Sequence, residues 1–335
     1  MQMKWQIDQG KRKYQLNFAS YSSLFVNHTM REDKLIQSLV EFFQPRSKMK
    51  NSMTITDIAN DFDAINHHSF TAFELSGELL NEEMKLGAKS LLKAKLKHDF
   101  LNHIETDGYI LTINTLAHDL LDSVVEQLPV KMKDMTIDTL LKLFEIDFDL
   151  MDEENDILSR NKMIIDFIIS YLSSKYNHAL ILFFSFPELY LSPKEQILMK
   201  EYLVELSEKA HIFVITNSKN FVTNDIVGNN YFSYDEQLLT DDFFDDLEWE
   251  SPLPYTKTEL IQSTQNIIKS HVDAFELKPS ISNYKQADII SFNSIDLYVL
   301  VFILNKLGFD YELDVDHDLI KKPVLKYIMD VYENI

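Results

Sequence analysis

The segment between Met84 and His98 has five lysines and no acidic residue: Lys85, Lys89, Lys93, Lys95 and Lys97. On a helix, steps of four residues place all of these except Lys95 on one face, over about 18 Å. Like charges at this spacing destabilise a helix slightly, so a compensating negative charge is expected. A DNA backbone would supply it, because lysines contact phosphates without reading bases. A solvated helix face, kept soluble by lysine, explains the pattern equally well.

Histidine pairs that could act in catalysis are explained by chance, because adjacent residues on a helix face different directions. These pairs are His67-His68, His98-Asp99 and His118-Asp119. Glu276 and Lys278, with Asp273 upstream, are the residue types of a metal-dependent nuclease, but the two acids are too close in sequence to come from separate strands. We therefore expect no enzymatic activity, and keep a divergent metal-dependent nuclease or ATPase as an alternative.

The composition excludes several other classes of site. There is no cysteine, which removes disulfides, thiol nucleophiles and zinc–cysteine sites. The six glycines lie far apart, so neither a GxGxxG nor a GxxxxGK phosphate loop can be formed. No apolar run approaches the roughly 20 residues of a membrane-spanning helix, and the first residues do not form a signal peptide. We therefore expect a cytoplasmic protein with no nucleotide and no membrane partner.

The charge of the chain is unevenly distributed. Its 32 Lys and Arg against 53 Asp and Glu give a formal net charge of −21, which argues against a globally basic nucleic-acid binder. Eight acids and no base lie within residues 235–250, followed by Pro252 and Pro254, a pattern that predicts a domain boundary. An acidic exterior would confine DNA to a basic channel. An acidic protein-interaction scaffold built on residues 235–250 is the remaining alternative function.

Hydrophobic spacing predicts the elements that must position these residues. Strands are expected over 13–18 and 53–58, and helices over 31–43, 73–104, 112–127, 136–145 and 160–176. A β-α-β unit follows, with apolar runs at 179–185 and 211–216 around a helix that begins at Ser192 and Pro193. Its continuous apolar strands predict a parallel sheet covered on both faces. The tail should be helical over 257–271, 293–307 and 322–333.

The predicted fold class is α/β: a head with a parallel sheet, a long inserted helical leg and a mainly helical C-terminal extension. We expect the first part of the head at 1–72, the leg at 73–160, the second part of the head at 161–248 and the extension at 249–335.

Several segments in series resemble one protein family. They are the strand at Thr54 that runs into Asp57-Ile and the Phe62-Asp63 pair, the Thr136-Ile-x-x-Leu-Leu-Lys142 helix, and the β-α-β unit followed by Tyr231-Phe232. Their order over roughly residues 14–235 is similar to the DNA-end-binding, spacer-acquisition proteins of type II-A CRISPR systems, in their longer subtype.

This resemblance implies a head related to P-loop ATPases but without nucleotide motifs, and an inserted helical leg. It also implies a homotetrameric ring that holds double-stranded DNA ends in its central hole. The partners would be double-stranded DNA, further copies of the chain, the CRISPR integrase complex and the RNA-guided nuclease.

The resemblance further implies a calcium site in the segment before the Thr136 helix. Here that segment has Lys131 and Lys133 where acids would be expected, and only Glu126, Asp134 and Asp138 are nearby acids. We therefore place calcium in doubt as a cofactor, and expect the charges of Lys131 and Lys133 to replace the cation and contact DNA with the lysines of the 85–97 segment.

Overall fold

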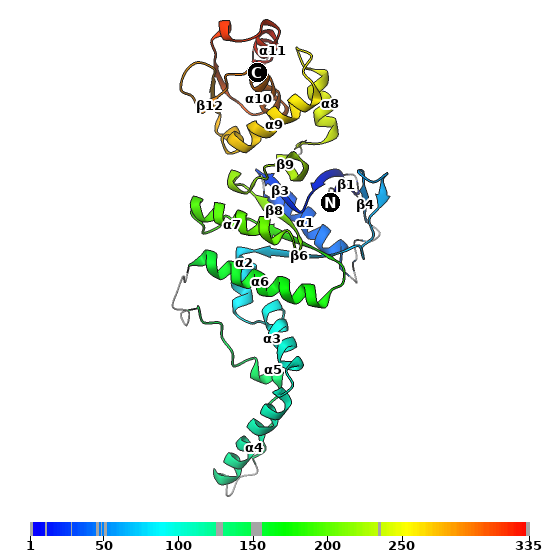
Figure 1. Ribbon diagram of the computed structural model, residues 1–335, viewed down its shortest axis with the longest axis vertical. Helices are drawn as coiled ribbons and strands as arrows, with labels where there is room; N and C mark the ends of the chain where they lie inside the picture. The colour runs from blue at the N-terminus through cyan, green and yellow to red at the C-terminus, as the bar shows by residue number, and fades with distance from the viewer. Residues whose placement is uncertain are drawn as a thin grey trace. The chain divides into compact units, whose positions relative to one another are not determined.

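The computed structural model describes residues 3–10, 12–27, 29–44, 47, 49, 52–124, 130–148, 156–233 and 236–332. The chain divides into two compact units (Figure 1). The first, which we call the head unit, joins Met1–Leu75 to His178–Ile335. The second, the insertion unit, is Ser76–Asn177. The insertion predicted for residues 73–160 thus continues to Asn177, because the last helix of this unit packs on two of its earlier helices.

A mostly parallel sheet forms the centre of the head unit. Its strands lie in the order β10-β9-β3-β8-β7-β6. They are β3 (Tyr21–Val26), β6 (Phe70–Ser76), β7 (Ala179–Ser185), β8 (His211–Thr216), β9 (Asn229–Ser233) and β10 (Glu236–Leu238). Strand β8 runs parallel to β3 and β7, β9 runs parallel to β3, and β10 pairs antiparallel with β9. The α/β class and the parallel sheet predicted from the sequence are confirmed.

The predicted β-α-β unit is also confirmed, as β7, α7 (Pro193–Leu206) and β8. Ser192 caps α7 by accepting a hydrogen bond from the Glu195 N–H, and the Glu195 side chain accepts one from the Ser192 N–H. This reciprocal pair satisfies two backbone donors at the helix start. The capping signal read from the sequence therefore marks the start of the helix correctly.

The two strands predicted near residues 14 and 53 lie in a different sheet. They are β2 (Arg12–Phe18) and β4 (Met53–Asp57), which pair antiparallel with β1 (Met3–Gln9) on either side, and β5 (Asp63–Ala64) completes the order β2-β1-β4-β5. A short connection at Gly10, with φ of +65°, joins β1 to β2, and such a turn can join only antiparallel strands. The two predicted strands are confirmed, and the structure places them in this second, antiparallel sheet of the head unit.

The core of the head unit covers both faces of the parallel sheet. On one face, the β3 residues Leu24 and Val26 pack with β1, β2, β4 and helix α1 (Thr29–Phe42), around the fully buried Trp5. The Trp5 ring lies 3.9 Å from that of Phe18, centroid to centroid. On the other face, Phe25 belongs to the core of the C-terminal part. Because successive side chains of a strand point to opposite faces of the sheet, neighbouring residues of β3 are buried in two different cores.

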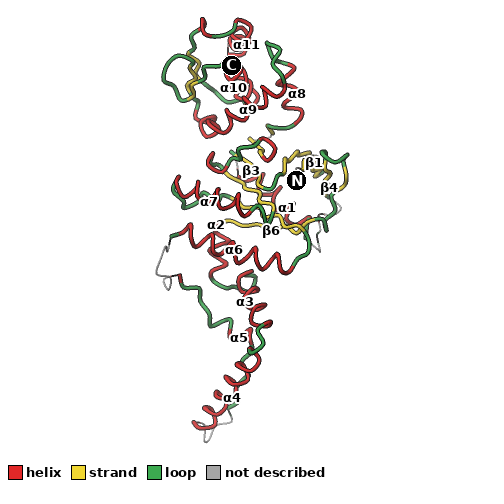
Figure 2. The backbone as a smooth tube through the Cα atoms, viewed as in Figure 1, coloured by secondary structure: helices red, strands yellow, loops and turns green. Residues whose placement is uncertain are grey.

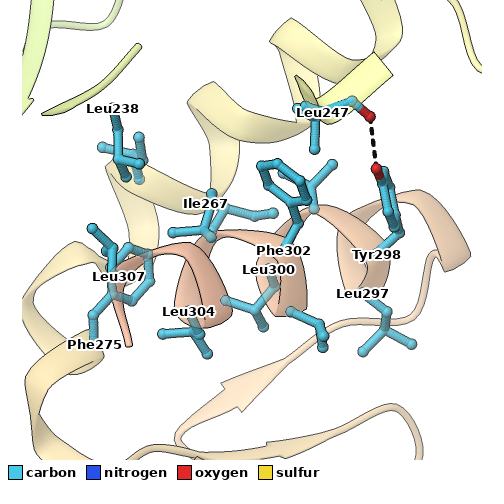
Figure 3. Close-up of a cluster of buried hydrophobic side chains, with 14 of the residues drawn as sticks. Leu238, Leu247, Ile267, Phe275, Leu297, Tyr298, Leu300, Phe302, Leu304 and Leu307 are labelled. Carbon is cyan, nitrogen blue, oxygen red and sulfur yellow. Dashed lines mark hydrogen bonds between the residues drawn. The ribbon is translucent and has the colours of Figure 1, made fainter. Parts of the chain in front are cut away.

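The C-terminal part of the head unit is built around one helix, α10 (Ser294–Leu307), whose residues 297–304 are all buried. Its other elements are α8 (Asp241–Trp249), α9 (Lys257–His271), α11 (Lys322–Tyr332), and a parallel sheet of β12 (Ile289–Ile290), β11 (Ser280–Ser282) and β13 (Glu312–Asp314). This part also has two short 3-10 helices, η5 (Val272–Leu277) and η6 (His317–Leu319). Two others, η3 (Lys219–Phe221) and η4 (Ile226–Gly228), lie between β8 and β9. Figure 3 shows α10 side chains in this core and the Tyr298 hydroxyl, which donates to the Leu247 carbonyl at 2.6 Å.

The acidic stretch at 235–250 is not a linker in its described residues, 236–250. Most of it is helix α8, whose Phe243, Phe244 and Leu247 are buried while its acids face solvent. The three apolar residues lie at helical spacing, so the acids belong to an amphipathic helix. The domain boundary predicted near residue 248 stays a prediction.

The insertion unit consists of helices and loops after Ser76 (Figure 2). They are α2 (Gly77–Met84), α3 (Leu91–Asn102), α4 (Thr106–Val124), α5 (Ile137–Leu140) and α6 (Ile157–Lys175), with α6 packed on α2 and α3. Over the described part of the chain, no helix is long and apolar enough to cross a membrane.

Candidate nucleic-acid interface

The lysine-rich segment is not one continuous helix. Helix α2 ends at Met84, and α3 begins only at Leu91. Between them, Leu86 adopts a left-handed conformation with φ of +47°, and Ser90 starts α3 by accepting a hydrogen bond from the Lys93 N–H at 3.0 Å. The Glu83 carboxylate accepts from the Ser90 hydroxyl and the Leu92 N–H, which fixes this reversal. The prediction of a single helix over 73–104 was wrong.

The break separates the predicted lysine ladder into two groups. Lys85 caps α2 and forms an ion pair with Glu82 at 2.5 Å, and the exposed Lys89 lies in the turn before α3. Lys93, Lys95 and Lys97 are on α3. Lys95 forms an ion pair with Asp99 and lies 5.5 Å from the Phe167 ring centroid, so its side chain is only 17% exposed. Four-residue steps therefore relate only Lys93 and Lys97 on one helix face.

Tertiary packing adds a lysine that the sequence reasoning missed. The Lys97 ammonium donates to both oxygens of Asp138 on α5, at 2.6 and 2.8 Å. This hydrogen bond, with the charges of Lys97, Lys93 and Lys142, lowers the pKa of the Asp138 carboxyl. We call Lys93, Lys97 and Lys142 the three-lysine cluster. Its three positive charges exceed the single negative charge of Asp138, so the cluster is the candidate anion-binding surface.

Helix α5 is short but firmly positioned. Thr136 and Thr139 cap it reciprocally, and Leu141 just after it is buried. This cap brings Asp138 and Lys142, four residues apart, to the α3 surface. Asp138 and Lys142 belong to the Thr136-Ile-x-x-Leu-Leu-Lys142 motif, so the motif itself could have pointed to Lys142.

Lys131 and Lys133 lie on a non-helical segment before α5, and both are exposed. This segment is tied to α4, because Asn114 exchanges two hydrogen bonds with the Met135 backbone and His118 pairs with Asp134 at 3.0 Å. Among the described residues, no hydrogen bond or ion pair joins either lysine to the three-lysine cluster. Their role in DNA binding stays a prediction.

The calcium candidates occupy three different settings. Glu126 lies outside the described residues, Asp134 pairs with His118, and Asp138 pairs with Lys97. Within the ranges that the structure describes, no group of three His, Asp or Glu side chains is arranged to hold a metal ion. Calcium binding stays a prediction.

Helix α4 carries a line of exposed apolar side chains. Tyr109, Ile113, Leu116 and Leu120 follow one another by four, three and four residues, the spacing of a coiled-coil seam. Leu116 is 63% exposed and Leu120 is 67% exposed. We call these four residues the α4 stripe. Beside it, Leu96, Asp99, Phe100, His103, Thr106 and Tyr109 line a mainly apolar cavity of about 290 Å³.

The carboxyl edge of the parallel sheet holds one buried acid. Glu188 follows β7, and its Oε1 accepts a hydrogen bond from the Asn217 N–H at 2.8 Å at the end of β8. Its Oε2 is buried without a hydrogen-bond partner in the described structure. Burial raises the pKa of the Glu188 carboxyl above its ordinary value, although the Asn217 bond acts in the opposite direction.

This raised pKa predicts a pH-dependent loss of stability. The folded state binds the Glu188 proton more tightly, so the stabilisation is present below the ordinary glutamate pKa and is lost as pH rises through the folded value. The variant Glu188→Gln should therefore melt like the wild type at pH 4 and higher than it at pH 8, by roughly 3 °C for each kcal/mol gained. Melting curves at both pH values measure this. The exposed Glu208→Gln is the control, and an equal difference at both pH values would contradict the prediction.

Comparison with known proteins identifies a shared fold. No protein-family profile and no curated protein sequence matches this chain. The solved structure of Stu0660 of Streptococcus thermophilus is similar, with a TM-score of 0.58 and 16% identity, over 97% of this chain and 100% of that chain. A nucleotide-free ATP-binding cassette from an ABC transporter has a TM-score of 0.33 and 12% identity, over 71% of this chain and 90% of that chain. The likeness to Stu0660 shows a common fold along nearly the whole chain.

Proposed function

We propose that this protein is a non-catalytic, double-stranded DNA-binding protein of CRISPR adaptation that closes as a homotetramer around DNA ends. The observation that carries this proposal is the three-lysine cluster, which presents excess positive charge on a chain whose net charge is −21. A protein with so negative a net charge repels DNA over much of its surface, so an excess of positive charge marks a place where DNA could bind. The serial resemblance over roughly residues 14–235 and the fold shared with Stu0660 support the family context.

Phosphate contact by lysine accounts for affinity without sequence preference. Lysine ammonium groups neutralise backbone charge and release counterions, whereas reading a base needs groove contacts. The Asp138 carboxylate accepts hydrogen bonds from Lys97, and we expect a DNA phosphate to compete with it for the lysines of the cluster. We expect binding that is independent of DNA sequence and strongly dependent on salt.

The α4 stripe supports self-association. An apolar seam of this spacing gains stability when a second helix covers it, because burial removes its exposed leucines from water. We propose that copies of the chain meet through this stripe to form the tetramer. The CRISPR integrase complex and the RNA-guided nuclease are the partners proposed for the assembled protein.

A mobility-shift experiment tests this function. The full-length protein is titrated into a linear duplex and into a covalently closed circle of the same sequence, at about 0.1 M salt where non-specific phosphate binding is still strong. We expect a marked preference for the linear form, because a closed ring must be threaded over an end. Equal affinity for both forms would refute the ring, and no binding to either would refute the DNA-binding function.

A surface variant separates assembly from DNA contact. Changing Leu116 and Leu120 together to Glu puts like charges on the α4 stripe, away from the three-lysine cluster in sequence. We expect the protein to become smaller by light scattering and to lose its preference for linear DNA. Tetramers that persist in this variant would show that the stripe is not the assembly surface.

A further inference from the structure

Trp249 is a large apolar side chain left in water at the end of α8. It is 89% exposed, while Phe243, Phe244 and Leu247 on the opposite side of the same helix are buried. Removing a side chain of this kind from water is favourable, so a partner that covered Trp249 would gain binding free energy. Tryptophan is also among the residues most enriched at the centres of protein interfaces, where it combines apolar area with a hydrogen-bond donor.

The surface around Trp249 is acidic. Asp242, Asp245 and Asp246 precede it by seven, four and three residues, so helical spacing puts them on the same face. Asp245 pairs with Lys257 at 2.7 Å, and Asp246 pairs with Lys306 at 2.9 Å. Glu248 and Glu250 flank the tryptophan in sequence, and Glu250 accepts a hydrogen bond from the Tyr327 hydroxyl. For Asp242 and Glu248, the described structure records no ion pair.

The acids at the end of α8, Glu248 and Glu250, oppose the electrostatics of their own helix. The carboxyl end of a helix carries a partial negative charge, which favours cations there, yet no base lies in the last turn of α8. Asp242 and Asp246 also repel each other at a four-residue spacing. The lysines from α9 and α10 offset only part of this charge. The face therefore attracts an external cation.

We propose that this outer face of α8, centred on Trp249, is a docking surface for a lysine- or arginine-rich segment of a partner protein. A partner guanidinium or ammonium group stacks on the indole, and its neighbours pair with Glu248 and Asp242. The same acids repel nucleic acid, and no described group of three acids here is arranged to hold a metal ion. This inference is independent of the proposed DNA-binding function, because it uses a different unit of the chain.

The test uses the full-length protein and a fluorescein-labelled peptide of alternating arginine and alanine, with an alternating glutamate peptide for comparison. Anisotropy should show binding of the arginine peptide only. The variant Trp249→Ala, which keeps every charge, should weaken binding about fivefold, the effect of one exposed cation–π contact. The variant with Asp242→Asn and Glu248→Gln should weaken binding and flatten its dependence on salt.

Phe292→Ala is the matched control, because Phe292 is 73% exposed in the same unit and should be dispensable. The chain has two tryptophans and Trp5 is buried, so acrylamide quenching of indole emission reports mainly on Trp249. We expect the arginine peptide to protect Trp249 from quenching. Equal peptide affinity for wild type and Trp249→Ala would overturn the proposal. A change in oligomeric mass caused by Trp249→Ala would also overturn it, in favour of a second copy as occupant.

Discussion

Replacing Lys93, Lys97 and Lys142 together by alanine should weaken binding of linear duplex DNA about a hundredfold at about 0.1 M salt. Lys97 contacts the Asp138 carboxylate and the charges of Lys93 and Lys142 act on it, so removing all three leaves Asp138 as an exposed negative charge. Each lysine that contacts a phosphate adds about 0.9 to the slope of log affinity against log salt, so this slope should fall by about 2.7. Anisotropy titrations at several salt concentrations measure both quantities.

Conservative variants distinguish the effect of lost charge on DNA binding from the effect of a disturbed fold. Changing the same three lysines to arginine keeps the charge and should keep the salt slope. Asp138→Asn removes the internal competitor for phosphate, so it should raise DNA affinity severalfold. Alanine at Lys194, Lys209 and Lys326, which are exposed in the head unit, is the matched control for total charge. An unchanged salt slope in the first variant would falsify the assignment of the three-lysine cluster.

The variant Phe302→Ala should lower the free energy of unfolding by about 4 kcal/mol, the usual cost of removing a buried aromatic ring. Phe302 is 3% exposed on α10 and lies 5.7 Å from the Phe243 ring of α8, centroid to centroid. Its loss leaves a cavity between the two helices in the core shown in Figure 3. Chemical denaturation followed by circular dichroism measures the change.

Two further variants calibrate this result. Phe292→Ala removes the same side chain from the surface and should change stability by less than about 0.5 kcal/mol. Tyr298→Phe removes only the hydroxyl bonded to the Leu247 carbonyl and should cost about 1 kcal/mol. If Phe302→Ala were no more destabilising than Phe292→Ala, α10 would not be the centre of the core.

The sequence correctly predicted those helices and strands whose apolar spacing and capping residues lie within the element itself. The apolar runs of β7 and β8 and the Ser192 cap of α7 needed no distant partner to be recognised, and α9, α10 and α11 begin and end close to their predicted bounds. Strand β3 was missed because its two serines interrupt the apolar pattern, although all six of its residues are buried. The Ser22 hydroxyl accepts a hydrogen bond from the nearby Ala19 N–H, whereas the Ser23 hydroxyl accepts one from the Thr223 N–H, distant in sequence, at 2.8 Å.

The candidate site was predicted only in part. Spacing along the chain correctly related Lys93 to Lys97, but it extended the helix through Leu86 and Ser90, where a left-handed residue and a cap end one helix and start another. Lys142 entered the site through the contact between α3 and α5, which no periodicity encodes. In the sequence, Lys95 cannot be distinguished from the neighbouring lysines. In the structure its ammonium group pairs with Asp99 and lies over the Phe167 ring, so it is not part of the three-lysine cluster.

The sequence alone determined the fold class, the absence of cysteine and of GxGxxG and GxxxxGK motifs, and the lysine-rich segment as the place to look for an anion-binding site. These follow from composition and from periodicities of two and 3.6 residues, which are properties of neighbouring positions. The tertiary structure decided which sheet each N-terminal strand joins, that the acidic stretch is helix α8, and which lysines gather around Asp138. Those outcomes depend on contacts between residues far apart in the chain, whose energies a linear pattern does not contain.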